Sequence, residues 1–156
     1  MAAVLCGFLC GTGFAQELDV NGYSKVVVPR SQGDYFNYQA GLREAARDAG
    51  FELNRSVEEI PSEDWPKTLY LRAGLNLKTI GIYVVVYDVA LQTPIAVCQW
   101  RLVADRRVSP ARNFDKRIAA ILRALIDDMG YRGFDQSAYE ANVRARNSVA
   151  SANQQS

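Results

Sequence analysis

The clearest pattern along the chain is an alternation of apolar and polar residues in the segment 67–78. The apolar members occupy every second position: Leu69, Leu71, Ala73, Leu75 and Leu77. Because successive side chains of a strand point to opposite faces of a sheet, this pattern predicts a strand with one buried face. Residues 80–91 are apolar on both faces, as expected for a central strand. After a turn at Gln92–Pro94, residues 95–103 predict a third strand, and the short connections favour an antiparallel meander.

Two other segments have apolar residues at helical spacing. The first runs from a cap at Asp34 or Asn37 to about Ala49, and Gly50 follows it as the expected left-handed stop. Its apolar face consists of Tyr38, Leu42, Ala45, Ala46 and Ala49. The second begins at Ser109 or Asn113 and ends at Gly130. Its apolar face consists of Phe114, Ile118, Ile121, Leu122, Leu125 and Met129.

With short strands at 24–29 and 51–53, the element order becomes β-α-β-β-β-α. We therefore expect one α+β domain over residues 16–134, in which two helices pack on one face of a mostly antiparallel sheet of about five strands. Residues 135–156 are polar and predict a tail, or a marginal helix around 138–149. The expected core residues are Leu69, Leu71, Leu75, Val85, Trp100, Ile118, Leu122 and Leu125.

The first fifteen residues lack charged side chains, and their apolar run is too short to span a membrane comfortably. Gly13 and Ala15 place small residues at −3 and −1 of a cut before Gln16, so we predict a signal peptide at 1–15 and a segment that lies apart from the core. The leader lacks the usual basic residues, which a true start upstream of Met1 would supply. The alternative is an apolar strand packed in the core.

Cleavage before Gln16 would remove Cys6 and Cys10 and leave Cys98 as the only cysteine, so we expect a mature chain without an internal disulfide. Cys98 shares one face of its predicted strand with Ala96, Trp100 and Leu102. We therefore predict a buried and unreactive thiol rather than a nucleophile. This interpretation implies an exported protein, periplasmic or secreted, without a transmembrane span.

Few residues suggest catalysis. The chain contains no histidine, which excludes the commonest general base and the commonest zinc ligand. It also lacks a phosphate loop of the P-loop or dinucleotide type. The acidic run Glu58, Glu59, Glu63 and Asp64 lacks the alternating ligand order of a calcium loop, so we interpret it as a solvated loop. We therefore expect no catalytic residues, no cofactor and no metal site, and an enzyme that relies on carboxylates is the third-ranked hypothesis.

Charge is distributed unevenly along the chain. Residues 1–65 carry 5 basic and 10 acidic side chains, whereas residues 66–156 carry 13 and 7, for an overall charge of +1. Near-neutral charge argues against a dedicated nucleic-acid binder. Five cations precede or begin the last predicted helix: Arg106, Arg107, Arg112, Lys116 and Arg117. A helix N-terminus favours anions, so this cluster is a candidate phosphate or carboxylate site, unless Asp105, Asp115 or the acidic half of the domain neutralises it.

Together these patterns predict a small, non-catalytic binding or accessory domain of a bacterial-type cell envelope, with the sheet edge or the basic cluster as its working surface. Its partner would be an envelope protein. The alternative is a soluble receptor in which the basic cluster binds an anionic small molecule or glycolipid head group.

Overall fold

A computed structural model describes residues 3–8, 18–30, 38–76, 81–101 and 114–154. Within them, six strands form one sheet in the order β1-β6-β5-β4-β2-β3. The strands are β1 (Ala3–Phe8), β2 (Lys25–Val27), β3 (Glu52–Asn54), β4 (Thr68–Asn76), β5 (Gly81–Asp88) and β6 (Thr93–Arg101). The α-helices are α1 (Tyr38–Ala49), α2 (Phe114–Asp128) and α3 (Gln136–Gln154), and the short 3₁₀ helices are η1 (Val20–Gly22), η2 (Val57–Glu59) and η3 (Ser62–Lys67).

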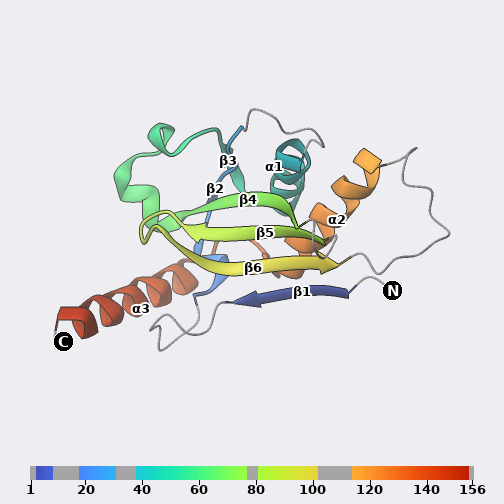
Figure 1. Cartoon of the computed structure of the whole chain (residues 1–156). Helices are drawn as coiled ribbons and strands as arrows, with labels where there is room; N and C mark the ends of the chain where they lie inside the picture. The colour runs from blue at the N-terminus through green and yellow to red at the C-terminus, as the bar shows by residue number, and fades with distance from the viewer. Residues whose placement is uncertain (1–2, 9–17, 31–37, 77–80, 102–113, 155–156) are drawn as a thin grey trace.

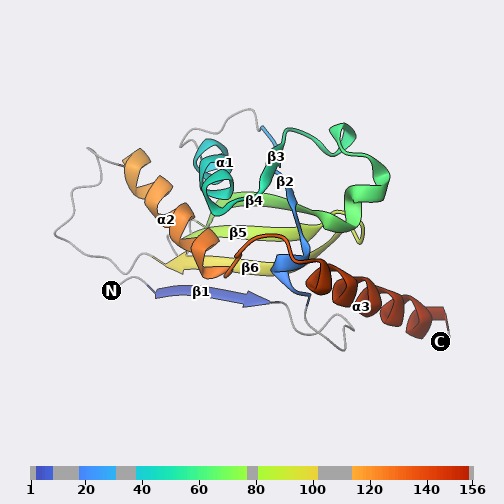
Figure 2. The same ribbon diagram turned by 180° about the vertical axis from the view of Figure 1, so that it is seen from behind.

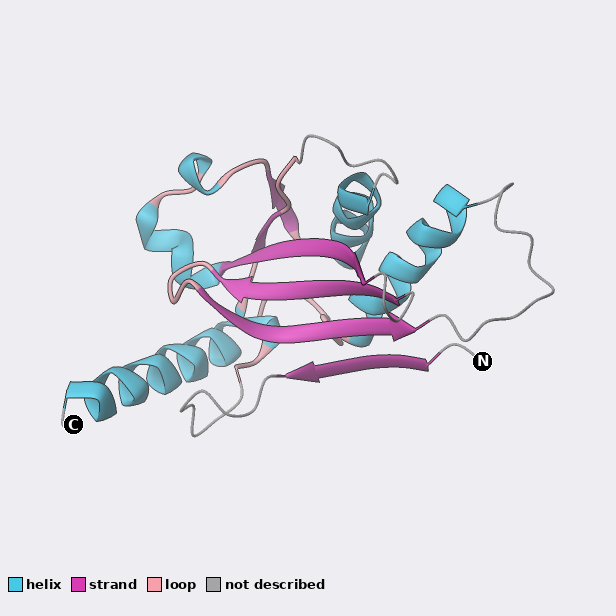
Figure 3. Ribbon diagram, viewed as in Figure 1, coloured by secondary structure: helices cyan, strands magenta, loops and turns pink. Residues whose placement is uncertain are grey.

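The sheet has a parallel half and an antiparallel half (Figure 3). β2 pairs in parallel with both β3 and β4. α1 forms the crossover that allows β2 and β3 to run parallel. β4, β5 and β6 form the predicted antiparallel meander. The α+β class is therefore confirmed, although the sheet is mixed.

α1 and α2 lie side by side on one face of the sheet, as predicted (Figures 1 and 2). Both helices end where the sequence indicates: Gly50 and Gly130 take φ values of 107° and 75° in the left-handed region that suits glycine. The side chains that are fully buried between these helices and the sheet include Leu42, Leu69, Leu71, Val84, Leu122 and Leu125.

Four of the eight expected core residues are confirmed as buried: Leu69, Leu71, Leu122 and Leu125. Val85 is only half-buried, because the strict alternation of β5 turns Ile82, Val84 and Val86 toward the helices and Val85 toward the other face. The side chains of the remaining three, Leu75, Trp100 and Ile118, lie outside the described residues.

The polar C-terminal segment forms the long helix α3, which extends away from one end of the sheet (Figure 1). Its first half packs on η1 through Ala138, Asn142 and Ala145, all buried. The Asn142 side chain accepts from the Asp19 N–H at 2.8 Å and donates to the Asp19 carbonyl at 2.9 Å. Most of the segment expected as a tail or a marginal helix around 138–149 is thus helical over Gln136–Gln154, and the helix is held by polar contacts rather than by a broad apolar face.

Residues 3–8 do not lie apart from the sheet, so that expectation is wrong for this chain. They form β1, which pairs antiparallel with β6 from Ala3↔Arg101 to Phe8↔Ala96. Cys98 is buried, as predicted, and in the full chain it is disulfide-bonded. The expectation of a mature chain without an internal disulfide depends on the removal of Cys6 and Cys10 and stays a prediction. The register places Cys6 directly opposite Cys98. Cleavage before Gln16 stays a prediction.

Among the described residues, no helix combines the length and the apolar character needed to cross a membrane.

Candidate functional site

The face of the sheet opposite α1 and α2 carries a second set of large side chains. β4 contributes Tyr70 and Arg72, and β5 contributes Tyr83, Val85 and Tyr87. The tyrosines and Val85 are half-buried, and Arg72 is exposed. This set follows directly from strand periodicity, because Leu69, Leu71, Val84 and Val86 occupy the helix-covered face. We call it the open face.

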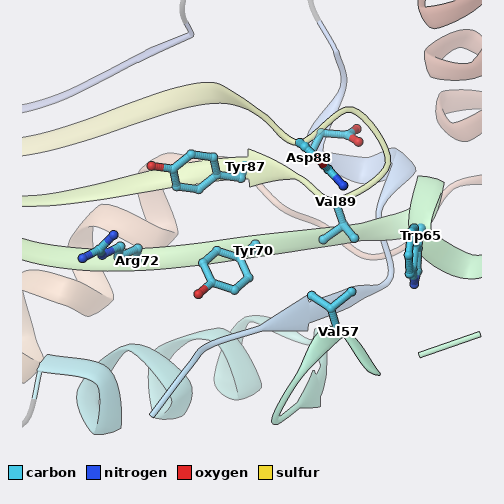
Figure 4. A pocket seen from close by; sticks show the side chains of 8 residues that line it. Val57, Trp65, Tyr70, Arg72, Tyr87, Asp88 and Val89 are labelled. Carbon is cyan, nitrogen blue, oxygen red and sulfur yellow. The ribbon is translucent and has the colours of Figure 1, made fainter. Parts of the chain in front are cut away.

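A groove of about 250 Å³ lies at one end of the open face. Its lining residues are Val57, Trp65, Tyr70, Arg72, Tyr87, Asp88, Val89 and Gln92. Figure 4 shows the rings of Tyr70 and Tyr87 beside Arg72, with Val57, Val89 and Trp65 toward the other end. The walls therefore come from η2, η3, the two central strands and the turn after β5.

Local contacts fix the walls of this groove. Tyr70 and Tyr87 are cross-strand partners, and their rings meet edge to face with centroids 6.0 Å apart. The indole Nε1 of Trp65 donates to the Ile60 carbonyl at 3.2 Å, which orients its ring at the border of the groove. Gln92 adopts a φ of 55°, and its N–H donates to the Asp88 carbonyl at 2.8 Å, which closes the turn between β5 and β6.

Beneath the turn, Asp88 forms a buried ionic network. Its Oδ2 accepts from the Tyr23 hydroxyl at 2.6 Å and from Arg146 Nη2 at 2.7 Å, and its Oδ1 accepts from the Leu91 N–H at 2.9 Å. Arg146 Nη2 also donates to the Pro66 carbonyl at 2.8 Å. Asp88 is fully buried and the Arg146 side chain is 10% exposed. In Figure 4 the Asp88 carboxylate points away from Tyr70 and Tyr87.

The network shifts the pKa of two of its members, Tyr23 and Arg146. Burial, with the Asp88 carboxylate beside it, raises the pKa of Tyr23 far above its usual range. Burial alone would lower the pKa of Arg146, but Tyr23 and Asp88 beside it raise the pKa overall. Tyr23 therefore stays neutral and Arg146 stays charged at physiological pH.

This arrangement suits binding better than proton transfer. Asp88, the one carboxylate among the lining residues, has both oxygens occupied and points away from the groove. Arg72 is the remaining charged side chain of the lining. The groove thus offers aromatic and aliphatic surface with a single exposed cation.

The basic cluster lies mostly beyond what the structure describes. Arg106, Arg107 and Arg112 fall outside the described residues. Lys116 and Arg117 lie in the first turn of α2, but their side chains are not described. The anion site therefore stays a prediction. In the acidic run, Asp64 accepts from Lys25 Nζ at 3.1 Å and Glu59 accepts from the Arg55 N–H at 3.1 Å.

The sequence reasoning missed the groove. The alternation of β4 already assigned Tyr70 and Arg72 to the face away from the core. The signal that could have identified the surface was the matching alternation of Tyr83, Val85 and Tyr87 on the next strand. No local signal links Asp88 to Tyr23 or Arg146, because these residues lie 65 and 58 positions away in the sequence.

Comparison with known structures supports the fold. The chain is similar to PelC from Paraburkholderia phytofirmans, solved as a dodecamer, with a TM-score of 0.50 and 11% identity over 85% of this chain and 99% of that one. A single-residue variant of that dodecamer aligns with a TM-score of 0.48, also at 11% identity and over the same shares of the two chains. No protein-family model and no curated protein matches the sequence. At 11% identity, this similarity shows a shared fold and nothing more specific.

Proposed function

We propose that this protein is a non-catalytic binding or accessory domain of a bacterial-type cell envelope, exported to the periplasm or secreted after removal of residues 1–15. The observation that carries the proposal is the groove on the open face. Its one carboxylate, Asp88, is already hydrogen-bonded within a buried network. Tyrosine, tryptophan and arginine are the residue types that dominate protein–protein binding energy. The groove presents all three.

The test is capture of partners from a bacterial envelope extract by the exported protein. Arg72→Glu reverses the exposed charge of the groove and is expected to abolish capture of the specific partner. Arg144→Glu is the matched control, because Arg144 is an equally exposed arginine on α3, outside the groove lining. If both variants capture the same proteins as the parent, the groove is not the binding surface.

We further propose that the protein works as an assembly of identical copies. The support is the similarity of its fold to PelC, a protein solved as a dodecamer. Native mass spectrometry of the exported protein tests this part, and a single-subunit mass at micromolar concentration would contradict it. The anion-receptor alternative rests on the basic cluster and stays a sequence-based hypothesis.

A further inference from the structure

The two edges of the sheet differ strongly in their capacity to pair with another strand. β3 ends the sheet on one side with three residues, Glu52–Asn54, and its exposed Glu52 forms an ion pair with Lys25 Nζ at 3.9 Å. On the other side the edge strand is β1, which pairs with six of the nine residues of β6 and covers what would otherwise be a long edge. A short, charged edge resists pairing, whereas a long apolar edge invites it.

β1 belongs to the segment that we propose is removed on export. Its loss would leave β6 as an unprotected edge with a row of unpaired backbone N–H and C=O groups. The same loss would remove Cys6 and Cys10, which are the two candidate disulfide partners of Cys98 in a chain with three cysteines. Ala96 and Cys98 are buried in the structure with β1 in place, so an unpaired β6 would also expose apolar side chains at its edge.

We propose that, in the mature protein, the β6 edge pairs antiparallel with β6 of a second copy of this chain. This inference rests on the proposed export and self-assembly. An antiparallel pair of identical edges is related by a two-fold axis, the commonest symmetry of homo-oligomers. The pairing of β1 with β6 supports this arrangement, because it shows that residues 96–101 of β6 can pair with an antiparallel, apolar strand. The sheets of the two copies would then be continuous, and backbone hydrogen bonds would supply the contact.

A charge placed on the middle of β6 tests this pairing. The full chain is expressed with its leader in a bacterial host, and the exported protein is measured by native mass spectrometry. In Val97→Lys, a half-buried residue of the open face becomes a cation within the stretch that would pair with the second copy, and the same cation on that copy opposes pairing. Thr93→Lys is the matched control, because Thr93 is exposed in the same strand but outside the stretch that pairs with β1.

The expected result is an even number of subunits for the parent and for Thr93→Lys, each beginning at Gln16, and a shift to single subunits for Val97→Lys. Circular dichroism checks that Val97→Lys is folded. If that variant does not fold, a second measurement replaces it: a soluble peptide that carries the sequence of residues 3–8, with serine in place of Cys6, should dissociate the parent assembly, and a scrambled peptide should not.

The outcomes separate the two proposals. A folded Val97→Lys variant that stays assembled overturns the β6 pairing and leaves self-assembly standing, as does an assembly that the peptide does not dissociate. An assembly of subunits that retain residues 1–15 also overturns the pairing, because β1 then occupies the edge. A parent protein that is a single subunit overturns self-assembly and the β6 pairing together.

Discussion

Arg146 and Asp88 form a contact whose loss would leave a buried charge without its partner. The Arg146 guanidinium donates to Asp88 through both Nε and Nη2, at 3.2 and 2.7 Å. Removing one member of a buried ion pair costs about 3–5 kcal/mol, because the remaining charge is left unpaired and dehydrated. We therefore expect Arg146→Ala to lower the free energy of unfolding, measured in urea, by about that amount.

The control for this prediction is the ion pair between Arg123 and Asp48, whose side chains are 54% and 47% exposed. Exposed pairs contribute about 0–1 kcal/mol, so Arg123→Ala should change stability little. Equal effects of the two substitutions would show that the Asp88 network does not stabilise the fold more than a surface contact does.

The raised pKa of Tyr23 predicts that the stability of the fold depends on pH. Its pKa in the folded protein is raised by burial and by Asp88, whereas in the unfolded chain it is about 10. Above that pH the unfolded state loses a proton that the folded state retains, so stability is full below pH 10 and falls as the pH rises further. Tyr131, whose pKa burial also raises, contributes in the same direction.

The measurement is the free energy of unfolding at pH 9 and pH 11 for the parent and for Tyr23→Phe. The variant cannot ionise at this position, so its stability should fall less over this interval. A slope identical to that of the parent would mean that Tyr23 is not the titrating group, and the double variant with Tyr131→Phe would then locate it.

At the scale of elements, the docking of α3 depends on a glycine. A methyl group on Gly22 would overlap the side-chain amide of Asn142 and come within 3.0 Å of the Tyr139 backbone. Gly22→Ala should therefore push α3 from η1 and raise hydrogen exchange at the amides of α3. Asn147→Ala, at an exposed position on the same helix, should leave exchange unchanged or slower, since alanine favours helix. Unchanged exchange in Gly22→Ala would show that α3 adjusts without undocking.

The packing of α2 gives a second prediction at this scale. Leu122 is fully buried, whereas the adjacent Ile121 is half-buried. Truncating a buried leucine costs about 2–5 kcal/mol, so Leu122→Ala should lower the free energy of unfolding within that range. Ile121→Ala should cost clearly less. A loss of less than about half a kcal/mol for Leu122→Ala would mean that the buried face of α2 is misassigned.

Sequence periodicity was most informative where one face of an element is buried. The alternation of β4 and the helical spacing of α2 correctly predicted Leu69, Leu71, Leu122 and Leu125 as core residues. For α3 the sequence indicated only a tail or a marginal helix, because a helix that docks through Asn142 and a buried arginine has no broad apolar face to detect. It also could not show that β2 lies between β3 and β4, since strand order depends on pairing between distant segments.

At the scale of the whole molecule, the two faces of the sheet differ. α1 and α2 bury one face and supply the core, whereas the groove with Tyr70, Tyr87 and Arg72 lies on the other face, which we propose as the binding surface. The sequence contains the residues of this candidate site, but it does not indicate that they lie together in space. Trp65 lies in η3 and Val57 in η2, and the hydrophobic pattern of these connecting segments has no regular period.

The N-terminal segment leads to the last prediction. If residues 1–15 are cleaved, the exported protein begins at Gln16 and retains one cysteine; if they stay, β1 remains paired with β6 and the chain keeps its three cysteines and the disulfide of Cys98. Intact mass and thiol alkylation of the unfolded protein distinguish these states. We expect one alkylated cysteine per chain both before and after reduction, on a chain that starts at Gln16.

Unfolding before alkylation is necessary because Cys98 is fully buried in the native protein. The retained chain would instead bind one label before reduction and three after it, since reduction releases the two cysteines of the disulfide. A Cys98→Ser variant serves as the control: the cleaved form then binds no label at all, whereas the retained form still binds labels at Cys6 and Cys10 after reduction. Three labels on a full-length exported chain would establish β1 as the edge strand of the working protein and would refute the signal-peptide prediction.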